Sequence, residues 1–323
     1  MMTTELTIAK SLNQALRTAM EEDSKVLLFG EDIGKLGGVF RVTDGLHKDF
    51  GDHRVLDSPL AESGIVGTAI GLAMRGYRPV LEIQFDGFVF PAFDQIISQL
   101  AKVHRRTNGS VKLPITIRIP YGGGIGAVEH HSESPETFFT HIPGLRVLSP
   151  SDPQSAYSCL LSAIRSNDPV IFFEPKRRYW DKGYVDRTQS PADPWRARIV
   201  RTGSDVTVVA YGPMVKTALQ AANASEYSLE VIDLQSLSPI DDRSIVDSVE
   251  RTGRLVIVHE APGNLGLGAE IAARIGKSCF YTLEAPIERV TGYDIPYPPS
   301  KLEEHYLPDH DRILVAVDSV MEA

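Results

Sequence analysis

The chain of 323 residues has little cysteine and no apolar run long enough to cross a membrane. Its two cysteines, Cys159 and Cys279, are too few for a disulfide framework or a Cys-rich zinc site. Both lie in apolar stretches, which predicts two buried thiols in a reducing compartment. The longest uncharged stretch around the small-residue run is Ser63 to Met74, well short of the roughly 20 residues of a bilayer-spanning helix.

A dense basic run is also missing, because 33 basic face 42 acidic side chains and the net charge is -9. Such a chain is a poor partner for nucleic acid or for an anionic membrane. The first ten residues, MMTTELTIAK, lack the pattern of a signal peptide or an organelle presequence. We therefore expect a cytoplasmic protein of bacterial type, or a mature protein of an organelle matrix whose presequence has been removed.

Helix-like and strand-like segments alternate along almost the whole chain. Continuous apolar strands separated by amphipathic stretches are typical of mostly parallel sheets covered by helices on both faces. From Pro175 to Ser204 the sequence is charged, punctuated by proline and weakly periodic, as expected of a connection between domains. The sequence thus predicts an α/β protein with one domain at 1–185, a linker at 186–204 and a second domain at 205–323.

The apolar pattern also predicts two further elements. Residues 92–104 carry apolar side chains at helical spacing, which predicts one helix with Pro91 in its first turn. The stretch CFYTLEA, 279–285, is interpreted as a buried strand of the second domain.

The stretch 62–75 contains three glycines, Gly64, Gly67 and Gly71, that fall on nearly one face of a predicted helix. Each interior glycine costs about 1 kcal/mol relative to alanine, which favours close approach by another backbone, within the domain or across a subunit interface. Glu62, in the first turn, has two interpretations. It is either a carboxylate stabilised by the helix dipole, or a buried acid beside a ligand.

The segment YGGGIGAVEHH follows a strand and formally fits a dinucleotide-binding glycine pattern. No long helix is predicted to begin at the glycines, and no acidic residue follows about 20 positions later, so nucleotide binding of that kind is rejected. The glycines instead predict a loop that passes close to something bulky. The adjacent His130 and His131, with His141 ten residues on, do not have the spacing of a zinc site, whereas a single loop histidine suits proton transfer.

Strand ends supply two further candidates, because parallel sheets bind ligands at the carboxyl ends of their strands. Gln84 closes the predicted strand 79–84 and precedes a cluster of phenylalanines that is more typical of a core than of a binding platform. The glycine-rich loop 263–268 follows another strand and is a weaker candidate, with helix packing as its alternative.

Taken together, the sequence resembles the β subunits of the thiamine-diphosphate-dependent 2-oxo acid dehydrogenases, nearly from end to end, and most closely the branched-chain type. The motifs that carry the resemblance are GEDIGKLGGVFRVTDGL, SPLAESGIVGTAIGLAMRGYRPVLEIQF, FVFPAFDQI, HHSESPETFFTHIPGLRVLSP, PVIFFEPK, GSDVTVVAYG, EVIDLQSLSPID, and GRLVIVHEAP with LEAPIERVTGYDIPYP. The resemblance implies a pyrimidine-binding domain followed by a transketolase-type C-terminal domain.

The resemblance also implies roles for individual residues. Glu62 matches the glutamate that hydrogen-bonds the N1′ atom of the cofactor's aminopyrimidine. Leu60, Gln84 and Phe88 match positions that line the pyrimidine pocket, with Phe88 standing where relatives often have tyrosine. His131 matches the histidine that delivers a proton as the acyl group passes to the lipoyl dithiolane, whereas His130 has no such counterpart.

The family of thiamine enzymes anchors diphosphate and magnesium through a GDG motif, and no GDG occurs in this chain. The resemblance therefore implies that thiamine diphosphate is shared with an α subunit that holds the magnesium, in an α2β2 assembly that docks on a lipoyl-bearing acyltransferase. It also implies a potassium ion bound by backbone carbonyls. The equivalent positions are Leu113, Ile115, Thr116, Ala163, Ser166 and Asp168.

The substrate prediction is a branched-chain 2-oxo acid, since the run HSESPETFFTHIPG is closest to branched-chain relatives. Pyruvate and acetoin stay open, because much of the acyl pocket belongs to the α subunit in this family. Two alternatives of other kinds also stay open. One is a split transketolase-like or synthase fragment, and the other is a non-catalytic nucleotide-binding scaffold.

Overall fold

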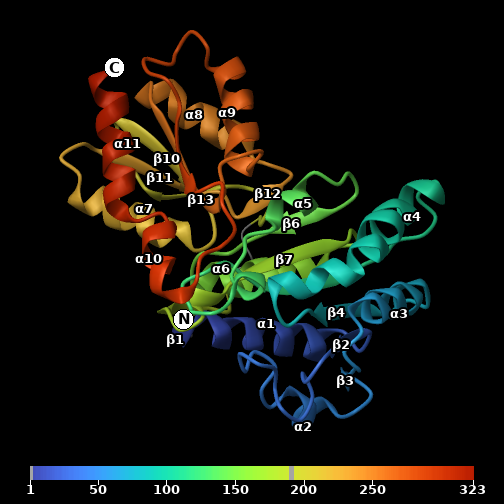
Figure 1. The fold of residues 1–323 in the computed structure, drawn as a ribbon. Helices are drawn as coiled ribbons and strands as arrows, with labels where there is room; N and C mark the ends of the chain where they lie inside the picture. The colour runs from blue at the N-terminus through green and yellow to red at the C-terminus, as the bar shows by residue number, and fades with distance from the viewer. Residues whose placement is uncertain (1–2, 189–192) are drawn as a thin grey trace.

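A seven-stranded sheet forms the centre of the N-terminal lobe of the computed structural model, which describes residues 3–188 and 193–323 (Figure 1). Six of its strands are parallel, and β12 pairs antiparallel with β6 at one edge. The order is β12 (Ser236–Ser238), β6 (Arg146–Leu148), β7 (Val170–Pro175), β5 (Thr116–Tyr121), β4 (Arg78–Glu82), β2 (Val26–Gly30) and β3 (Val55–Asp57).

Helices cover both faces of this sheet because its strands are apolar on both sides. In β7, Phe172 packs on the face of α1 (Ile8–Glu22) and α6 (Pro153–Arg165), and Phe173 packs on the opposite face. The opposite face is covered by α3 (Glu62–Met74), η2 (Gln95–Leu100), α4 (Ala101–Arg106) and α5 (Glu136–Thr140). A small antiparallel ribbon joins β1 (Thr3–Thr7) to β8 (Lys182–Asp186).

The C-terminal lobe contains a five-stranded sheet in which β9 alone is antiparallel to its neighbour. Its order is β14 (Glu288–Gly292), β13 (Leu255–Pro262), β10 (Val206–Ala210), β11 (Leu229–Asp233) and β9 (Arg198–Arg201). α7 (Met214–Ala224) and α11 (His310–Glu322) pack on one face, and α8 (Asp242–Thr252) and α9 (Leu267–Ser278) on the other. The predicted α/β class with mostly parallel, helix-covered sheets is confirmed.

Short elements complete the chain and carry most of the functional loops. They are α2 (Leu46–Phe50), η1 (Asp86–Ala92), η3 (Glu129–His131), η4 (Lys176–Arg178), η5 (Ser300–Leu302) and α10 (Glu303–Tyr306). Gly253 ends α8 in the left-handed conformation, at φ 69°. Both cysteines are buried, as predicted. Among residues 3–188 and 193–323, none of the helices has both the length and the apolar character needed to cross a bilayer.

Three stretches differ from the sequence prediction. Residues 279–285 form turns after α9 with Tyr281 98% exposed, so the predicted strand is wrong and the sheet instead uses β14. The predicted helix 92–104 is present as a continuous helical stretch from Phe93 to Arg106, but its central part, η2, is π-helical, and Pro91 lies in the preceding η1. The predicted linker 186–204 contains β9, a strand of the second sheet, while its residues 189–192 lie outside the described residues.

The two lobes share one core. β12 follows β11 in the chain yet pairs in the N-terminal sheet, and Ser149 donates its backbone N–H to the carbonyl of Gln235 at 2.8 Å. The apolar layer beneath α3 and α4 continues into the layer beneath α8 and α9 as a single cluster of buried side chains. The loops of the N-terminal sheet are therefore held against the second lobe, at the centre of Figure 1.

Candidate functional site

The carboxyl ends of β2, β4 and β5 are neighbours, because these strands are adjacent and parallel in the sheet. From them start the loops that contain most of the residues singled out from sequence. This edge is where open parallel sheets bind ligands.

Glu62 lies at the start of α3 beside the loop that follows β2. Its side chain is buried, with the residue 8% exposed, and within residues 3–188 and 193–323 its carboxylate makes no hydrogen bond or ion pair. Its charge contributes, after burial and the charge of Asp32, to raising the pKa of Glu31. Gln84 Nε2 lies 3.5 Å from the Glu31 carbonyl and from Asp32 Oδ2, so the structure brings Gln84 and the surroundings of Glu62 together.

The glycines of α3 face outward. A Cβ atom at Gly71 would meet nothing within 4 Å, and one at Gly67 would meet only Gln95 Oε1, at 3.8 Å. No backbone outside α3 approaches this face within the described residues, so the close approach predicted from the glycines is not supplied by this domain. The other explanation given by the sequence, a subunit interface, stays a prediction.

Phe88 and His131 are in contact. Their ring centroids lie 5.0 Å apart with the rings almost perpendicular, and Phe85 stacks on His131 at 4.1 Å. The Nδ1 atom of His131 is buried and has no partner among the described residues, whereas the neighbouring His130 is half exposed. Leu60 is 68% exposed on the same edge of the sheet, ahead of α3. The hydrogen-bonding capacity of this ring nitrogen is thus unused within the described residues.

The glycine loop after β5 passes close to bulky side chains, as the sequence predicted. A Cβ atom at Gly123 would lie 1.8 Å from the hydroxyl of Tyr297, and one at Gly124 would lie 2.7 Å from Arg177 Cδ. Gly122, Gly124 and Gly126 have positive φ angles, and no long helix begins at these residues. The loop is therefore built for close packing.

A buried ionic cluster supports the same edge and was missed by the sequence analysis. Arg118 of β5 donates to both carboxylate oxygens of Glu174, at 2.6 and 2.9 Å, and to Glu82 of β4 at 2.7 Å. All three residues are buried, and Tyr179 donates to the Glu174 carboxylate at 2.6 Å. The available signal was a single charge near the end of each otherwise apolar central strand, in the segments PVLEIQ, ITIRIP and VIFFEP.

A second buried pair, Asp86 and Lys176, lies beside the histidine loop and was also missed. Lys176 Nζ contacts Asp86 Oδ1 and donates to the carbonyl of His131 at 2.6 Å. Burial raises the pKa of Asp86 to about 6 against the opposing effect of the lysine, and burial lowers the pKa of Lys176 against that of the aspartate.

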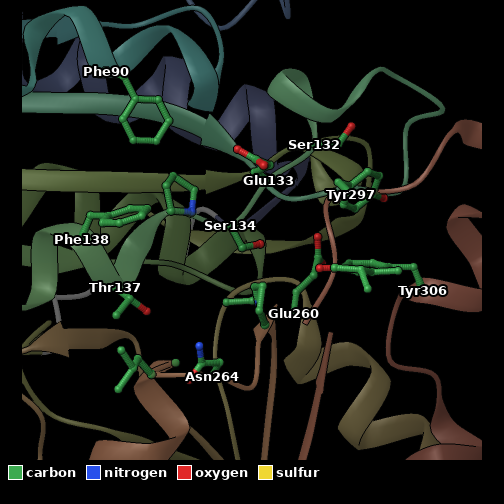
Figure 2. A pocket seen from close by; sticks show the side chains of 16 residues that line it. Phe90, Ser132, Glu133, Ser134, Thr137, Phe138, Glu260, Asn264, Tyr297 and Tyr306 are labelled. Carbon is green, nitrogen blue, oxygen red and sulfur yellow. The ribbon is translucent and has the colours of Figure 1, made fainter. Parts of the chain in front are cut away.

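A cavity of about 420 Å³ opens between the two lobes (Figure 2). Segment 132–138, directly after His131, provides one wall, and residues 260–266, at the end of β13 and in the loop after it, provide another. The hydroxyl oxygens of Ser132, Ser134 and Thr137 are buried there without a partner among the described residues. The cavity thus has apolar walls, formed in part by Phe90 and Phe138, and unused hydrogen-bonding capacity.

The glycine-rich loop 263–268, the weaker candidate from sequence, packs against its own domain. In the loop 263–268, a Cβ atom at Gly268 would lie 2.6 Å from His259 Nε2, which favours the helix-packing interpretation over a binding loop. Among the described residues, no group of three His, Cys, Asp or Glu side chains is placed to hold a metal ion.

The two segments expected to bind potassium meet at the amino ends of β5 and β7. The Ile115 carbonyl accepts the Val170 N–H at 2.9 Å, and the Ser166 carbonyl accepts from Arg78 Nη1 at the same distance. Three more of the expected positions are buried: Leu113, Thr116 and Ala163. The side chain of Asp168 forms an ion pair with Arg146. The Ile115 and Ser166 carbonyls each accept one of these hydrogen bonds and retain a second lone pair.

Comparison with known protein families agrees with this geometry. The profile "Transketolase, pyrimidine binding domain" matches residues 4–181, and "Transketolase, C-terminal domain" matches residues 196–313. A pyruvate dehydrogenase E1 component subunit beta of Leifsonia xyli subsp. xyli is 59% identical over 97% of this chain and 94% of its own length. The chain belongs to the family of 2-oxo acid dehydrogenase β subunits.

Relatives with different substrates in their names are similar to this chain over nearly its whole length. The 3-methyl-2-oxobutanoate dehydrogenase subunit beta of Mycobacterium tuberculosis is 53% identical, over 99% of this chain and 93% of its own. The 2-oxoisovalerate dehydrogenase subunit beta of Pseudomonas aeruginosa is 45% identical over 99% and 96%. Both pyruvate and branched-chain types therefore occur among the relatives.

A solved structure supports the fold alone. The "Split gene transketolase, inactive beta4 tetramer" superposes with a TM-score of 0.78 at 24% identity and covers 98% of both chains. The transketolase-like arrangement of two α/β domains, implied by the sequence resemblance, is thereby confirmed.

Proposed function

We propose that this chain is the β subunit of an enzyme that oxidatively decarboxylates a 2-oxo acid and transfers the acyl group to the lipoamide of an acyltransferase. The observation that carries the proposal is the carboxylate of Glu62. It is buried, unpaired within the described residues, and lies at the ligand-binding edge of the sheet beside an uncovered glycine face. Because the Glu62 carboxylate makes no hydrogen bond or ion pair within the described residues, it is available to a ligand that binds at this edge of the sheet.

The residues present fit the aminopyrimidine end of thiamine diphosphate. Glu62 would hold the pyrimidine N1′ through a hydrogen bond, and Leu60, Gln84 and Phe88 would line the pocket around it. When bound, the cofactor supplies the electron sink that decarboxylation requires. Glutamine at position 62 would keep a hydrogen bond but would have no proton to give.

The diphosphate end belongs to another subunit in this proposal. The chain has no GDG motif, and within the described residues no backbone from outside α3 lies close against its glycine face. An α subunit that packs on this face in an α2β2 assembly would hold the diphosphate and magnesium, and the cofactor would lie across the interface.

His131 serves the second half of the reaction. Its ring is held against Phe85, and its buried Nδ1 atom is unpaired within the described residues. We assign to it the delivery of a proton to the dithiolane sulfur as the acyl group leaves for the lipoyl domain of the acyltransferase.

The substrate proposed is a branched-chain 2-oxo acid, on the strength of the run HSESPETFFTHIPG. The relatives support pyruvate equally, since subunits of both types match nearly the whole chain. Assay of the assembled enzyme with pyruvate and with branched 2-oxo acids in parallel decides between them.

Potassium binding by the carbonyls of residues 113–116 and 163–168 is part of the proposal. Melting curves of the chain in potassium chloride and in sodium chloride at equal ionic strength test it. A melting temperature that is the same in both salts would remove the ion from the proposal.

The decisive experiment is co-purification with the α subunit, followed by cofactor-binding and activity assays. We expect the lone chain to bind thiamine diphosphate weakly and to be inactive, and the assembled enzyme to be active. In the assembly, Glu62→Gln should lower decarboxylation by about 100-fold or more, as expected for loss of an essential proton donor.

The matched control is Glu270→Gln, which changes a glutamate in the first turn of α9 that pairs with Arg274 at the surface. This variant should retain full activity. Full activity of Glu62→Gln would favour the scaffold alternative, and transfer of ketol units in place of acyl groups would favour a transketolase-like fragment.

A further inference from the structure

Lys176 and Asp86 form a clamp on the backbone of the loop that contains His131. Lys176 directly follows β7 and is the first residue of η4, and its side chain is completely buried. Its Nζ atom contacts Asp86 Oδ1 and donates to the carbonyl oxygen of His131 at 2.6 Å. The other oxygen of Asp86 accepts the backbone N–H of Glu133 at 2.9 Å. The pair therefore grips the loop on both sides of residue 132.

The ring of His131 is fixed by the same segment. Phe85, next to Asp86 in the chain, stacks on the imidazole at 4.1 Å with an angle of 17° between the rings. Gly87 makes this approach possible, because a Cβ atom there would lie 2.3 Å from the carbonyl oxygen of His130. Segment 85–88 thus orients both the backbone and the ring of the histidine.

Stability alone does not account for the pair. Both side chains are removed from water, and a buried ion pair is often no more stabilising than two well-packed apolar side chains of the same size. What an apolar pair cannot supply is directed hydrogen bonding to two specified backbone atoms. The geometry of the clamp is therefore suited to fixing the position of the histidine loop.

We infer that Asp86 and Lys176 are positioning residues for His131, and that they set the rate of acyl transfer to the lipoyl group without taking part in decarboxylation. The inference rests on the proposed function, in which His131 delivers a proton during transfer. The expected effect is limited to His131, because neither Asp86 nor Lys176 contacts Glu62 or Gln84 in the described structure.

The test uses the double variant Asp86→Asn/Lys176→Met in the assembled α2β2 enzyme. This variant leaves no unpaired buried charge, and the amide oxygen of the introduced asparagine keeps an acceptor for the Glu133 N–H, but the bond to the His131 carbonyl is lost. Two reactions are measured: decarboxylation with dichlorophenolindophenol as electron acceptor, and acyl transfer to an isolated lipoyl domain. Melting temperature reports whether each variant is folded.

We expect the double variant to lower kcat for acyl transfer by about tenfold or more, as loss of alignment predicts. Decarboxylation and the KM for the 2-oxo acid should change by less than about twofold. Lys176→Arg, which keeps the cation and its donors, should recover most of the transfer rate. Lys216→Met, which removes a lysine paired with Asp181 at the surface, should change neither reaction.

His131→Ala separates the two possible failures. If it lowers transfer selectively and the folded double variant does not, the clamp inference is wrong and the proposed function stands. If both reactions fall equally in the folded double variant, the pair has a general structural role and the inference is also wrong. If His131→Ala leaves transfer unchanged, the role of His131 fails, and the clamp inference fails with it.

Discussion

Glu136 is an acid buried at the junction of the two lobes. It is the first residue of α5, is 0% exposed, and accepts a hydrogen bond from the Tyr211 hydroxyl at 2.6 Å. Burial raises its pKa to about 7, the tyrosine opposes this, and the charges of Glu260 and Asp86 add to it. The folded protein therefore holds a proton on Glu136 over a range of pH in which the unfolded chain has lost it.

The pH dependence of stability follows from this difference. The contribution of Glu136 is fully present below its ordinary pKa of 4.5 and is lost as the pH rises through about 7. Glu136→Gln removes the titration, so the free energy of unfolding of the variant should rise relative to the wild type between pH 4.5 and 7. The expected change across this window is roughly 3 kcal/mol. Urea unfolding at several pH values measures it.

The wild type and the Glu136→Gln variant must be compared at each pH, because His259 changes the free energy of unfolding with pH in the opposite direction. Burial lowers the pKa of His259 to about 4, which makes stability rise with pH between about 4 and 6.5. Tyr211→Phe gives an internal check, since loss of its hydrogen bond should raise the pKa of Glu136 further. Parallel stability curves for wild type and Glu136→Gln would contradict the prediction.

At this scale the sequence could predict which residues lie at strand ends but not which charges pair. Gln84 and the start of α3 are placed by the carboxyl ends of parallel strands, a rule that depends on local pattern. The partners of Arg118 depend on β4 and β7 flanking β5, and this strand order is not encoded in local spacing. For the same reason the contact between Asp86 and Lys176, 90 residues apart, could not be predicted.

α3 contains a glycine, Gly71, at a position where the fold of its own chain does not require one. Gly71 is exposed in the helix interior, with open space where a Cβ would be placed. Gly144 is the opposite case, because its φ angle is 103° and a Cβ there would lie 2.1 Å from the carbonyl oxygen of Ala101. The two glycines therefore give opposite predictions for the same substitution.

Gly71→Ala should stabilise the isolated chain by about 1 kcal/mol through helix propensity, and weaken its assembly with the α subunit by occupying the interface. Gly144→Ala should destabilise the isolated chain, because its backbone and its neighbour both exclude a methyl group. Urea unfolding of the isolated chain measures the first effect, and gel filtration with the α subunit measures the second.

If Gly71→Ala assembles with the α subunit as tightly as the wild type, the glycine face is not the interface. A loss of stability in the isolated Gly71→Ala chain would show instead that the face is already covered by another part of this chain or by a second copy.

Elements with strong periodicity were predictable, whereas short apolar runs were not. The apolar stripe of 92–104 is buried as expected, yet local geometry makes it a succession of η1, η2 and α4, since spacing alone does not separate a π-helical turn from an α-helical one. In 279–285, Cys279 is buried beneath the end of α9, but Phe280 and Tyr281 are exposed. A run of apolar letters therefore did not correspond to a buried face.

The whole molecule is held together by contacts that cross between the lobes. Arg198 of β9 pairs with Asp152 and Asp233 at 2.6 Å, and Ser151 donates to Asp233 at 2.6 Å. Glu303 accepts the backbone N–H groups of Gly124 and Gly126 in the glycine loop at 2.8 and 3.0 Å. With β12 in the N-terminal sheet, neither lobe is complete by itself.

We expect the isolated full-length chain to unfold in one cooperative transition by calorimetry, because the shared core couples both lobes. A fragment of residues 1–195 should be markedly less stable than the full chain and prone to associate, since it lacks β12 and leaves the edge of β6 unpaired. Two well-separated transitions in the full chain, or a fragment as stable as the N-terminal lobe in the full chain, would contradict this.

The position of β12 has a consequence for synthesis on the ribosome. Proteins with separable domains generally fold their first domain while the second is still being translated. Here the strand that seals the margin of the first sheet is encoded after β9, β10, α7 and β11. The nascent chain must therefore keep that margin open until residue 238 has emerged, which makes the interval a period of exposure to chaperones and to mispairing.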